Sequence, residues 1–148
     1  MGGILDSLLM YEAKCFDVHG RSLLNSPSKY YGVDLGIRGI LLPDHQEDYG
    51  HLIENIVFLE LLRRQRKAYV GKNRQYEVDF VGVDDQQRLS YYQVALTTLD
   101  PRVLARELRP LQKIHDAYPK YLLTLDTVNP TANYDGIQKE NIIDWLLK

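Results

Sequence analysis

The longest hydrophobic pattern in the chain follows Asp48, where apolar side chains occupy most of the circumference of a helix up to Leu62. Asp48 is a suitable N-cap residue. A basic run from Arg63 to Lys67 follows the pattern, and cations stabilise the negative end of a helix dipole. We therefore expect a deeply packed helix that begins near Asp48.

Shorter apolar stretches with turn residues between them predict the rest of an α-β-β-β-α-β order. Asp100-Pro101 marks the second helix, because it combines an N-cap acid with proline at the first helical position, and Pro119 should stop that helix. Asn129-Pro130 and Asp135-Gly136 mark loops. The predicted elements are strands at 68–71, 77–83 and 89–96, a helix from Asp100 to about Tyr118, a strand at 121–125 and a short helix at 142–147. This order predicts an α/β fold with a mixed sheet.

The first 41 residues have a different pattern. Leu5–Met10 indicates the tail of a helix, Cys15–Asp17 and Arg21–Leu24 a hairpin, and Lys29–Val33 a strand. A helix tail, hairpin and strand resemble the end of a winged helix-turn-helix. We expect two units, a winged-helix remnant at 1–41 and an α/β domain at 42–148.

Composition limits the classes of function. The chain has 148 residues and a formal net charge of −2, so its bulk charge does not favour tight binding to nucleic acid. The N-terminus lacks the features of a signal peptide, and no apolar run is long enough to cross a membrane. Cys15 is the only cysteine, which we expect to be an ordinary small apolar residue. A lone cysteine suits a reducing compartment, so we expect a cytoplasmic protein and no membrane partner.

Several kinds of site are absent from the sequence. The chain has no Walker A pattern and no serine or cysteine in a nucleophile elbow. No pair of histidines has metal-ligand spacing, so we expect no zinc site. The histidines are His19, His45, His51 and His115.

Two acids in apolar surroundings are the main candidates for chemistry. Glu54 lies in the apolar helix and Asp79 in the middle of a predicted strand, where acids are depleted. An unsatisfied carboxylate in such a place is costly, so the two could together hold a divalent cation. Alternatively, Glu54 hydrogen-bonds neighbouring backbone and Asp79 faces solvent.

Gln93 and Ala95 alternate on the next strand and share a face. If Asp79 shares this face, the Gln93 carbonyl could contact Mg²⁺, but without the charge of a carboxylate. Ala95 cannot stabilise a developing negative charge, which is usually the largest catalytic contribution. A cation from the following helix could replace it, and the candidates are Arg102, Arg106, Arg109 and Lys113.

One dense basic cluster could contact phosphate. It consists of Arg63, Arg64, Arg66 and Lys67. A solvated helix end is the alternative interpretation.

Several segments resemble one family. The first is Lys29-Tyr30-Tyr31-Gly32-Val33-Asp34-Leu35-Gly36-Ile37-Arg38, similar to a K-Y-Y-x-x-D-x-G-[LI]-R signature. The others are Gly50–Asn55 (G-x-x-x-E-N), Leu59–Arg64 (x-E-L-x-R), Glu77–Val81 (E-[VL]-D-F-[VL]) and Tyr118–Asp126 (Y-P-K-Y-x-L-T-L-D). The chain resembles the C-terminal domain, of unassigned function, of predicted AAA-superfamily ATPases.

The resemblance implies a PD-(D/E)XK nuclease-like, restriction-endonuclease-like fold, with Glu54, Asp79 and Gln93 at the nuclease-like positions. Many members have acid-x-lysine where this chain has Gln93-Val94-Ala95, so the metal site is expected to be vestigial or weak. The ATPase module would precede residue 1, so the chain is expected to be a piece of a longer ATPase or a standalone remnant.

These patterns leave three functions open. The first is a non-catalytic accessory domain of an AAA-family ATPase that binds a nucleic-acid or protein partner. The second is a Mg²⁺-dependent DNA nuclease with a variant Gln-x-Ala site. The third is a purely structural domain that self-associates through an apolar face.

Overall fold

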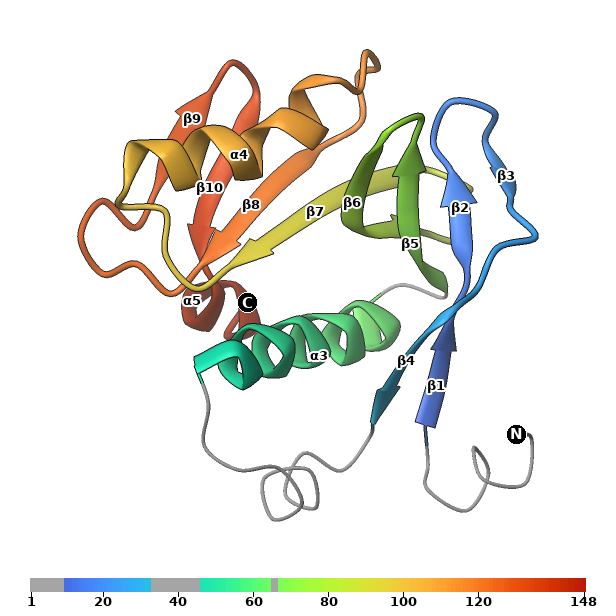
Figure 1. Cartoon of the computed structure of the whole chain (residues 1–148), viewed down its shortest axis with the longest axis horizontal. Helices are drawn as coiled ribbons and strands as arrows, with labels where there is room; N and C mark the ends of the chain where they lie inside the picture. Colours follow the sequence, from blue (N-terminus) through green and yellow to red (C-terminus); the bar gives the residue numbers. More distant parts are fainter. Residues whose placement is uncertain (1–9, 33–45, 65–66) are drawn as a thin grey trace.

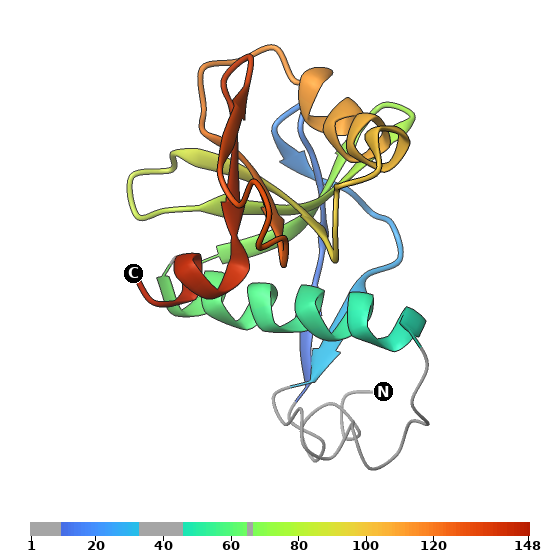
Figure 2. The same cartoon turned by 90° about the vertical axis from the view of Figure 1, so that its left-hand side faces the viewer.

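An eight-stranded mixed sheet lies between helices in the structure, a computed structural model that describes residues 10–32, 46–64 and 67–148 (Figure 1). Helices α3 and α5 cover one face of this sheet, and α4 covers the other (Figure 2). The helices are α3 (Gln46–Arg64), α4 (Pro101–Gln112) and α5 (Ile142–Leu146). The chain is therefore an α/β protein, and none of the helices in the described part combines the length and the apolar character needed to span a membrane.

The strand order of the large sheet is β3-β2-β5-β6-β7-β8-β10-β9. Pairing is parallel for β2–β5, β7–β8 and β8–β10 and antiparallel elsewhere. A separate antiparallel pair, β1–β4, packs beside α3. The strands are β1 (Met10–Ala13), β2 (Cys15–Asp17), β3 (Ser22–Leu23), β4 (Lys29–Gly32), β5 (Lys67–Asn73), β6 (Tyr76–Val83), β7 (Leu89–Ala95), β8 (Lys120–Thr124), β9 (Ala132–Tyr134) and β10 (Ile137–Asn141).

The order α3-β5-β6-β7-α4-β8 and the hairpin of β2 and β3 confirm most of the elements that the sequence predicted. The predicted boundary near residue 41 lies outside the described residues and stays a prediction, as does the helix tail at 5–9. The described strands on either side of that boundary share one sheet, because β2 pairs with β5.

Three element boundaries expected from the sequence were wrong. Helix α3 begins at Gln46, before the expected N-cap Asp48, and Met10 begins strand β1 instead of ending a helix. The loop expected at Asp135-Gly136 is confirmed: it is the two-residue turn of the β9–β10 hairpin, whose two strands were not expected, and both residues have the positive φ that such a turn requires. The third wrong boundary is the end of α4, which comes earlier than expected.

Helix α4 stops at Gln112, before the expected end near Tyr118. The Ile114 N–H donates to the Leu111 carbonyl, which tightens the last turn. The Asp116 carboxylate then accepts the Tyr118 N–H at 3.0 Å and holds a side-chain turn that leads into β8. This local hydrogen bond competes with helix formation before Pro119 is reached.

A β-bulge interrupts the pairing of β5 with β6. Tyr69 pairs with Val81, and the next pair is Gly71 with Val78, so β6 contributes one extra residue. The extra residue changes which face the following side chains occupy. Val78 packs among the α4-side core residues, whereas Phe80 packs among the α3-side core residues, although residues two apart on a regular strand share a face. The bulge therefore lies at Asp79, between them.

Gly71 leaves room for this bulge. A Cβ atom at Gly71 would lie 2.8 Å from Val81 Cγ2 and 3.0 Å from Val78 Cβ, closer than side chains pack. We expect Gly71→Ala to lower the free energy of unfolding by about 1–3 kcal/mol, because the buried bulge must shift. Urea unfolding measures this loss, and Gly50→Ala is the control, since nothing lies within 4 Å of a Cβ there. A variant at Gly71 as stable as the wild type would show that the bulge is not tightly packed.

Candidate functional site

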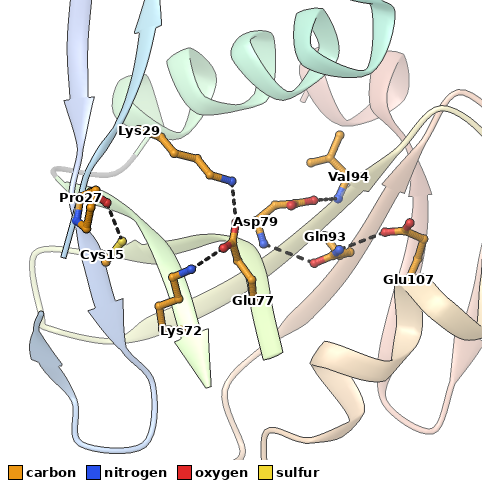
Figure 3. A network of polar contacts seen from close by, with 9 residues as sticks. All are labelled: Cys15, Pro27, Lys29, Lys72, Glu77, Asp79, Gln93, Val94 and Glu107. Atoms are coloured by element: carbon orange, nitrogen blue, oxygen red, sulfur yellow. Dashed lines mark hydrogen bonds and ion pairs between the residues drawn. The ribbon is translucent and has the colours of Figure 1, made fainter. Parts of the chain in front are cut away.

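Strands β6 and β7 separate next to the bulge. There, hydrogen bonds that involve side chains replace the backbone hydrogen bonds between the two strands. The last backbone pair at this end is Phe80 with Tyr92. Beyond it, the Asp79 N–H donates to the Gln93 side-chain oxygen at 3.3 Å, and the Val94 N–H donates to Asp79 Oδ2 at 2.8 Å (Figure 3). The bulge and the separation together hold Asp79 at a defined position between the two strands.

Gln93 also joins this position to helix α4. Its Nε2 atom donates to Glu107 Oε2 at 2.9 Å (Figure 3). Gln93 is buried, and its amide is engaged at both ends, by the Asp79 N–H and by the Glu107 carboxylate. Only a side chain with both a donor and an acceptor can make this pair of contacts.

Three carboxyl groups influence one another around this position. Burial raises the pKa of Asp79 to about 8, helped by the negative charges of Glu54 and Glu107 and opposed by the Val94 N–H. Burial likewise raises the pKa of Glu54, while the charge of Lys29 lowers it. Glu54 and Asp79, which the sequence singled out, thus lie within electrostatic reach of each other. Glu54 on α3, Asp79 on β6 and Glu107 on α4 thus form one group, which we call the acidic centre.

Lysines approach this centre from the other side, through Glu77. Lys29 on β4 donates to Glu77 Oε1 at 2.5 Å, and Lys72 on β5 pairs with Glu77 Oε2 (Figure 3). Burial lowers the pKa of Lys29, but the hydrogen bond to Glu77 and the charges of Glu77, Glu54 and Asp79 outweigh it, so this pKa is raised. Burial raises the pKa of Glu77, but its bonds to the two lysines outweigh burial and lower it. Lys29 therefore lies near the acids, although Ala95, at the position where the motif has lysine, carries no charge.

Helix α3 fixes the strand that carries Lys29. The Gly32 N–H donates to Asn55 Oδ1 at 3.1 Å, and Asn55 Nδ2 donates to the Gly32 carbonyl at 2.8 Å. Asn55 follows Glu54 directly, so the Glu54-Asn55 pair presents one acid to the site and clamps β4 with the next side chain. In the sequence, Lys29 stood out only as part of a motif, because its partner Glu77 is 48 residues away.

One of the candidate cations on α4 reaches the acidic centre, because Arg106 pairs with Glu107 at 3.2 Å. Arg102 pairs with the N-cap Asp100 at 3.5 Å instead. Arg109 is exposed in the last turn of α4. Lys113 lines a different cavity, at the end of α4.

The acidic centre does not match a metal site as it stands. No three carboxylate, imidazole or thiol side chains in the described ranges converge closely enough to hold an ion. The Gln93 oxygen and one oxygen of Asp79 already accept backbone N–H groups. The structure therefore brings Glu54, Asp79 and Gln93 together through hydrogen bonds and charge, without the ligand geometry that Mg²⁺ requires.

The predicted basic cluster is paired only in part, because two of its arginines share one carboxylate. Arg63 and Arg64 both pair with Glu60, at 2.6 and 2.7 Å. The Arg64 guanidinium also lies 4.4 Å from the centre of the Trp145 ring and donates to the Trp145 carbonyl, which ties α3 to α5. Arg66 lies outside the described residues, and Lys67 begins β5 with an exposed side chain.

Cys15 is a small core residue, as expected. Its side chain is buried, and Sγ lies 3.4 Å from the Pro27 carbonyl (Figure 3).

Comparisons with known proteins give one relative. The chain is 36% identical over 143 residues to a Haemophilus influenzae protein named only as uncharacterized. The match covers 97% of this chain, and the chain spans 34% of the length of that protein. No protein-family model and no solved structure matches the chain.

Proposed function

We propose that the chain is a PD-(D/E)XK nuclease-like accessory domain of an AAA-family ATPase that has lost strand cleavage and binds a nucleic-acid or protein partner. The motif resemblance supports the link to the ATPases. The acidic centre where β6 and β7 separate, with Glu54 within electrostatic reach of Asp79, supports the nuclease-like origin. The relative is long enough to contain a further module, since this chain spans only 34% of it.

The proposed loss of cleavage rests mainly on the amide of Gln93. Gln93 donates to Glu107 and accepts from the Asp79 N–H, so its neutral side chain is fully engaged in hydrogen bonds with these two residues. A carboxylate in its place could not donate to Glu107 and would repel it. The site is therefore built around a neutral group at a position where metal-dependent cleavage needs a negative ligand.

One observation favours the second candidate, a Mg²⁺-dependent DNA nuclease with a variant site. Lys29 lies beside Glu77 and is influenced by Glu54 and Asp79, so a cation from β4 is near the acids. In this candidate Lys29 would stabilise negative charge in the role that Ala95 cannot fill.

A cleavage assay separates the two candidates. Single- and double-stranded DNA are incubated with the chain in millimolar Mg²⁺ or Mn²⁺, beside Asp79→Ala and Lys29→Met. We expect no cleavage by the wild type above the level of Asp79→Ala, because the site lacks a negative ligand at Gln93 and a cation at position 95. Product lengths on a denaturing gel report the result.

Cleavage by the wild type that is lost in both variants would establish the nuclease candidate instead. Arg102→Gln is the matched control, because it removes a cation that pairs with the N-cap Asp100 and not with the acidic centre. In the nuclease candidate its activity must equal that of the wild type.

A further inference from the structure

A cavity of about 550 Å³ lies away from the acidic centre, between the β2–β3 turn, the β5–β6 turn and the end of α4. Three permanent cations from these three segments line it, namely Arg21, Arg74 and Lys113. His19 and His115 also line it. Segments far apart in the sequence thus gather positive groups around one hollow, although the chain as a whole has a net charge of −2.

These cations differ from most of the described arginines, which pair with a carboxylate. Arg63, Arg88 and Arg102, for example, each pair with a carboxylate that is two to four residues away in the chain. Within the ranges that the structure describes, no ion pair is found for Arg21, Arg74 or Lys113. The Arg21 guanidinium instead lies 5.3 Å from the centre of the Tyr118 ring, which holds it without neutralising it.

Asp116 is the one acid among the described residues that line the cavity, and its carboxylate is already engaged. It accepts hydrogen bonds from the Tyr91 hydroxyl at 2.6 Å and the Tyr118 N–H at 3.0 Å, and pairs with Lys120 at 3.2 Å. Its charge is therefore compensated from within the fold, and it leaves the cations of the cavity unpaired.

The carbonyls at the end of α4 would also repel an anion, but three of them accept hydrogen bonds. The Arg109 and Leu111 carbonyls accept from the Lys113 and Ile114 N–H groups. Asn73 Nδ2 donates to the Lys113 carbonyl at 3.0 Å. The same bond fixes the end of α4 against β5 and so positions Lys113 at the cavity.

Both arginines are in an uncommon backbone conformation. Arg21 has φ 53° and Arg74 has φ 57°, in the left-handed region that glycine or asparagine occupies at lower cost. Both residues lie in β-hairpin turns, where a positive φ is common and glycine or asparagine is the usual residue. The two turns thus carry large cationic side chains at positions that favour small residues.

We propose that this cavity binds phosphate groups of a nucleic-acid backbone. Arginine forms a planar fork that matches phosphate oxygens, and two arginines with a lysine supply the positive charge that a phosphodiester requires. Tyr76 also lines the cavity and offers a ring on which a base can stack. The identification of the ligand as nucleic acid rests on the proposed function, whereas the preference for phosphate rests on the cavity alone.

The position of the cavity agrees with this ligand. Tyr76 begins β6, and Asp79 follows on the same strand, about 10 Å further along. The cavity and the acidic centre thus lie along the same strand. The cavity deepens the proposed function by giving the partner of the nuclease-like domain a place to bind.

The test is DNA binding by the triple variant Arg21→Gln, Arg74→Gln, Lys113→Gln. A fluorescent single-stranded oligonucleotide is titrated with the full chain in EDTA at several low salt concentrations, so that neither cleavage nor bound metal contributes. We expect the affinity to fall at least about 10-fold and the slope of log K against log salt to fall by about 2, since three phosphate contacts are removed.

A matched control removes three positive charges at other positions. The triple variant Arg88→Gln, Arg102→Gln, Lys148→Gln also loses three positive charges, but these side chains are exposed and each is paired with its own acid. We expect this control to bind within about 2-fold of the wild type, because its three cations do not line the cavity. Equal losses in the two triple variants, or no binding by the wild type at low salt, would overturn the proposal.

Competition identifies the chemistry of the ligand. Unlabelled DNA should displace the labelled strand more effectively than poly-glutamate of equal charge, and equal displacement would contradict a phosphate site. A nucleoside monophosphate should compete only weakly, whereas full competition by it would assign the cavity to a small phosphate ligand and overturn the nucleic-acid backbone.

Two other outcomes, misfolding of the variant and cleavage of the DNA, are distinguished from a loss of binding. If the triple variant does not fold by circular dichroism, Arg74→Gln with Lys113→Gln replaces it, since both side chains are exposed. Cleavage of DNA in Mg²⁺ would refute the proposed loss of catalysis without affecting this binding result.

Discussion

Lys139→Met is expected to lower the free energy of unfolding by about 3–5 kcal/mol at pH 7, because it leaves a buried carboxylate without its cation. Lys139 Nζ lies 2.8 Å from Asp126 Oδ2, and the two side chains are 2% and 1% exposed. The Asp126 carboxylate also accepts from the Thr97 hydroxyl at 2.5 Å and from the Thr98 N–H and hydroxyl, each at 3.0 Å. These neutral donors cannot replace the charge of the ammonium group.

The same pair gives a pH dependence with a definite sign. Burial raises the pKa of Asp126, but Lys139, Thr97 and Thr98 outweigh it and lower this pKa to about 2. Because the folded pKa lies below the unfolded value, the stabilisation is present above about pH 4 and is lost as the pH falls towards 2. The difference between Lys139→Met and the wild type should therefore shrink in this acidic range.

Urea unfolding at a series of pH values checks both expectations, and Lys148→Met is the control. Lys148 pairs with Glu140 but its own side chain is 62% exposed, so its loss should change the free energy of unfolding by at most about 1 kcal/mol. Combining Lys139→Met with Asp126→Asn should recover much of the stability, since no unpaired charge then remains. Equal losses for Lys139→Met and Lys148→Met would show that the buried pair adds nothing beyond an exposed lysine.

The sequence predicted the elements whose patterns are local. The apolar helix, strands β5 to β8 and the Asp100-Pro101 helix start depend on neighbouring residues, and the Asp100 carboxylate does accept the Arg102 N–H at 2.8 Å. Asp135-Gly136 was a local signal for a loop, and it is the turn of the β9–β10 hairpin, but the two strands on either side of it were not expected.

The site was predictable only in part, because its contacts join distant residues. Asp79 and Glu54 were recognisable as acids in apolar surroundings. The bulge at Asp79 depends on how β6 pairs with β5, which the sequence of β6 alone does not determine. Glu107 meets Gln93 only because α4 packs across the sheet, and Lys29 reaches Glu77 only because α3 clamps β4.

Buried polar residues in the last strands were missed for a related reason. Lys139 and Glu140 stand in a segment whose composition indicates a loop, yet both are buried in β10. Lysine belongs in such a strand only if an acid is placed opposite it, and Asp126 lies just beyond the end of the neighbouring β8. No periodicity of hydrophobic residues reveals that pair.

Asp79→Asn is expected to stabilise the protein in EDTA, and increasingly so as the pH rises from about 4 to about 8. Burial and the charges of Glu54 and Glu107 raise the folded pKa of Asp79 to about 8, above its unfolded value. Between these two values the unfolded chain releases a proton that the folded chain keeps, so the wild type loses up to about 1.4 kcal/mol per pH unit. Asparagine does not titrate, and its carbonyl can still accept the Val94 N–H.

Chemical unfolding of the two proteins across this range gives the difference directly, and Glu77→Gln on the same strand is the matched control. Lys29 and Lys72 lower the pKa of Glu77, so neutralising it should destabilise the protein near neutral pH, opposite in sign to Asp79→Asn. A gain for Asp79→Asn that is independent of pH would mean that Asp79 is already ionised in the fold. Adding Mg²⁺ then separates the two proposed functions, because a metal-dependent nuclease should be stabilised by the ion only when Asp79 is present. If the site has lost its metal, Mg²⁺ leaves the stability difference between the two proteins unchanged.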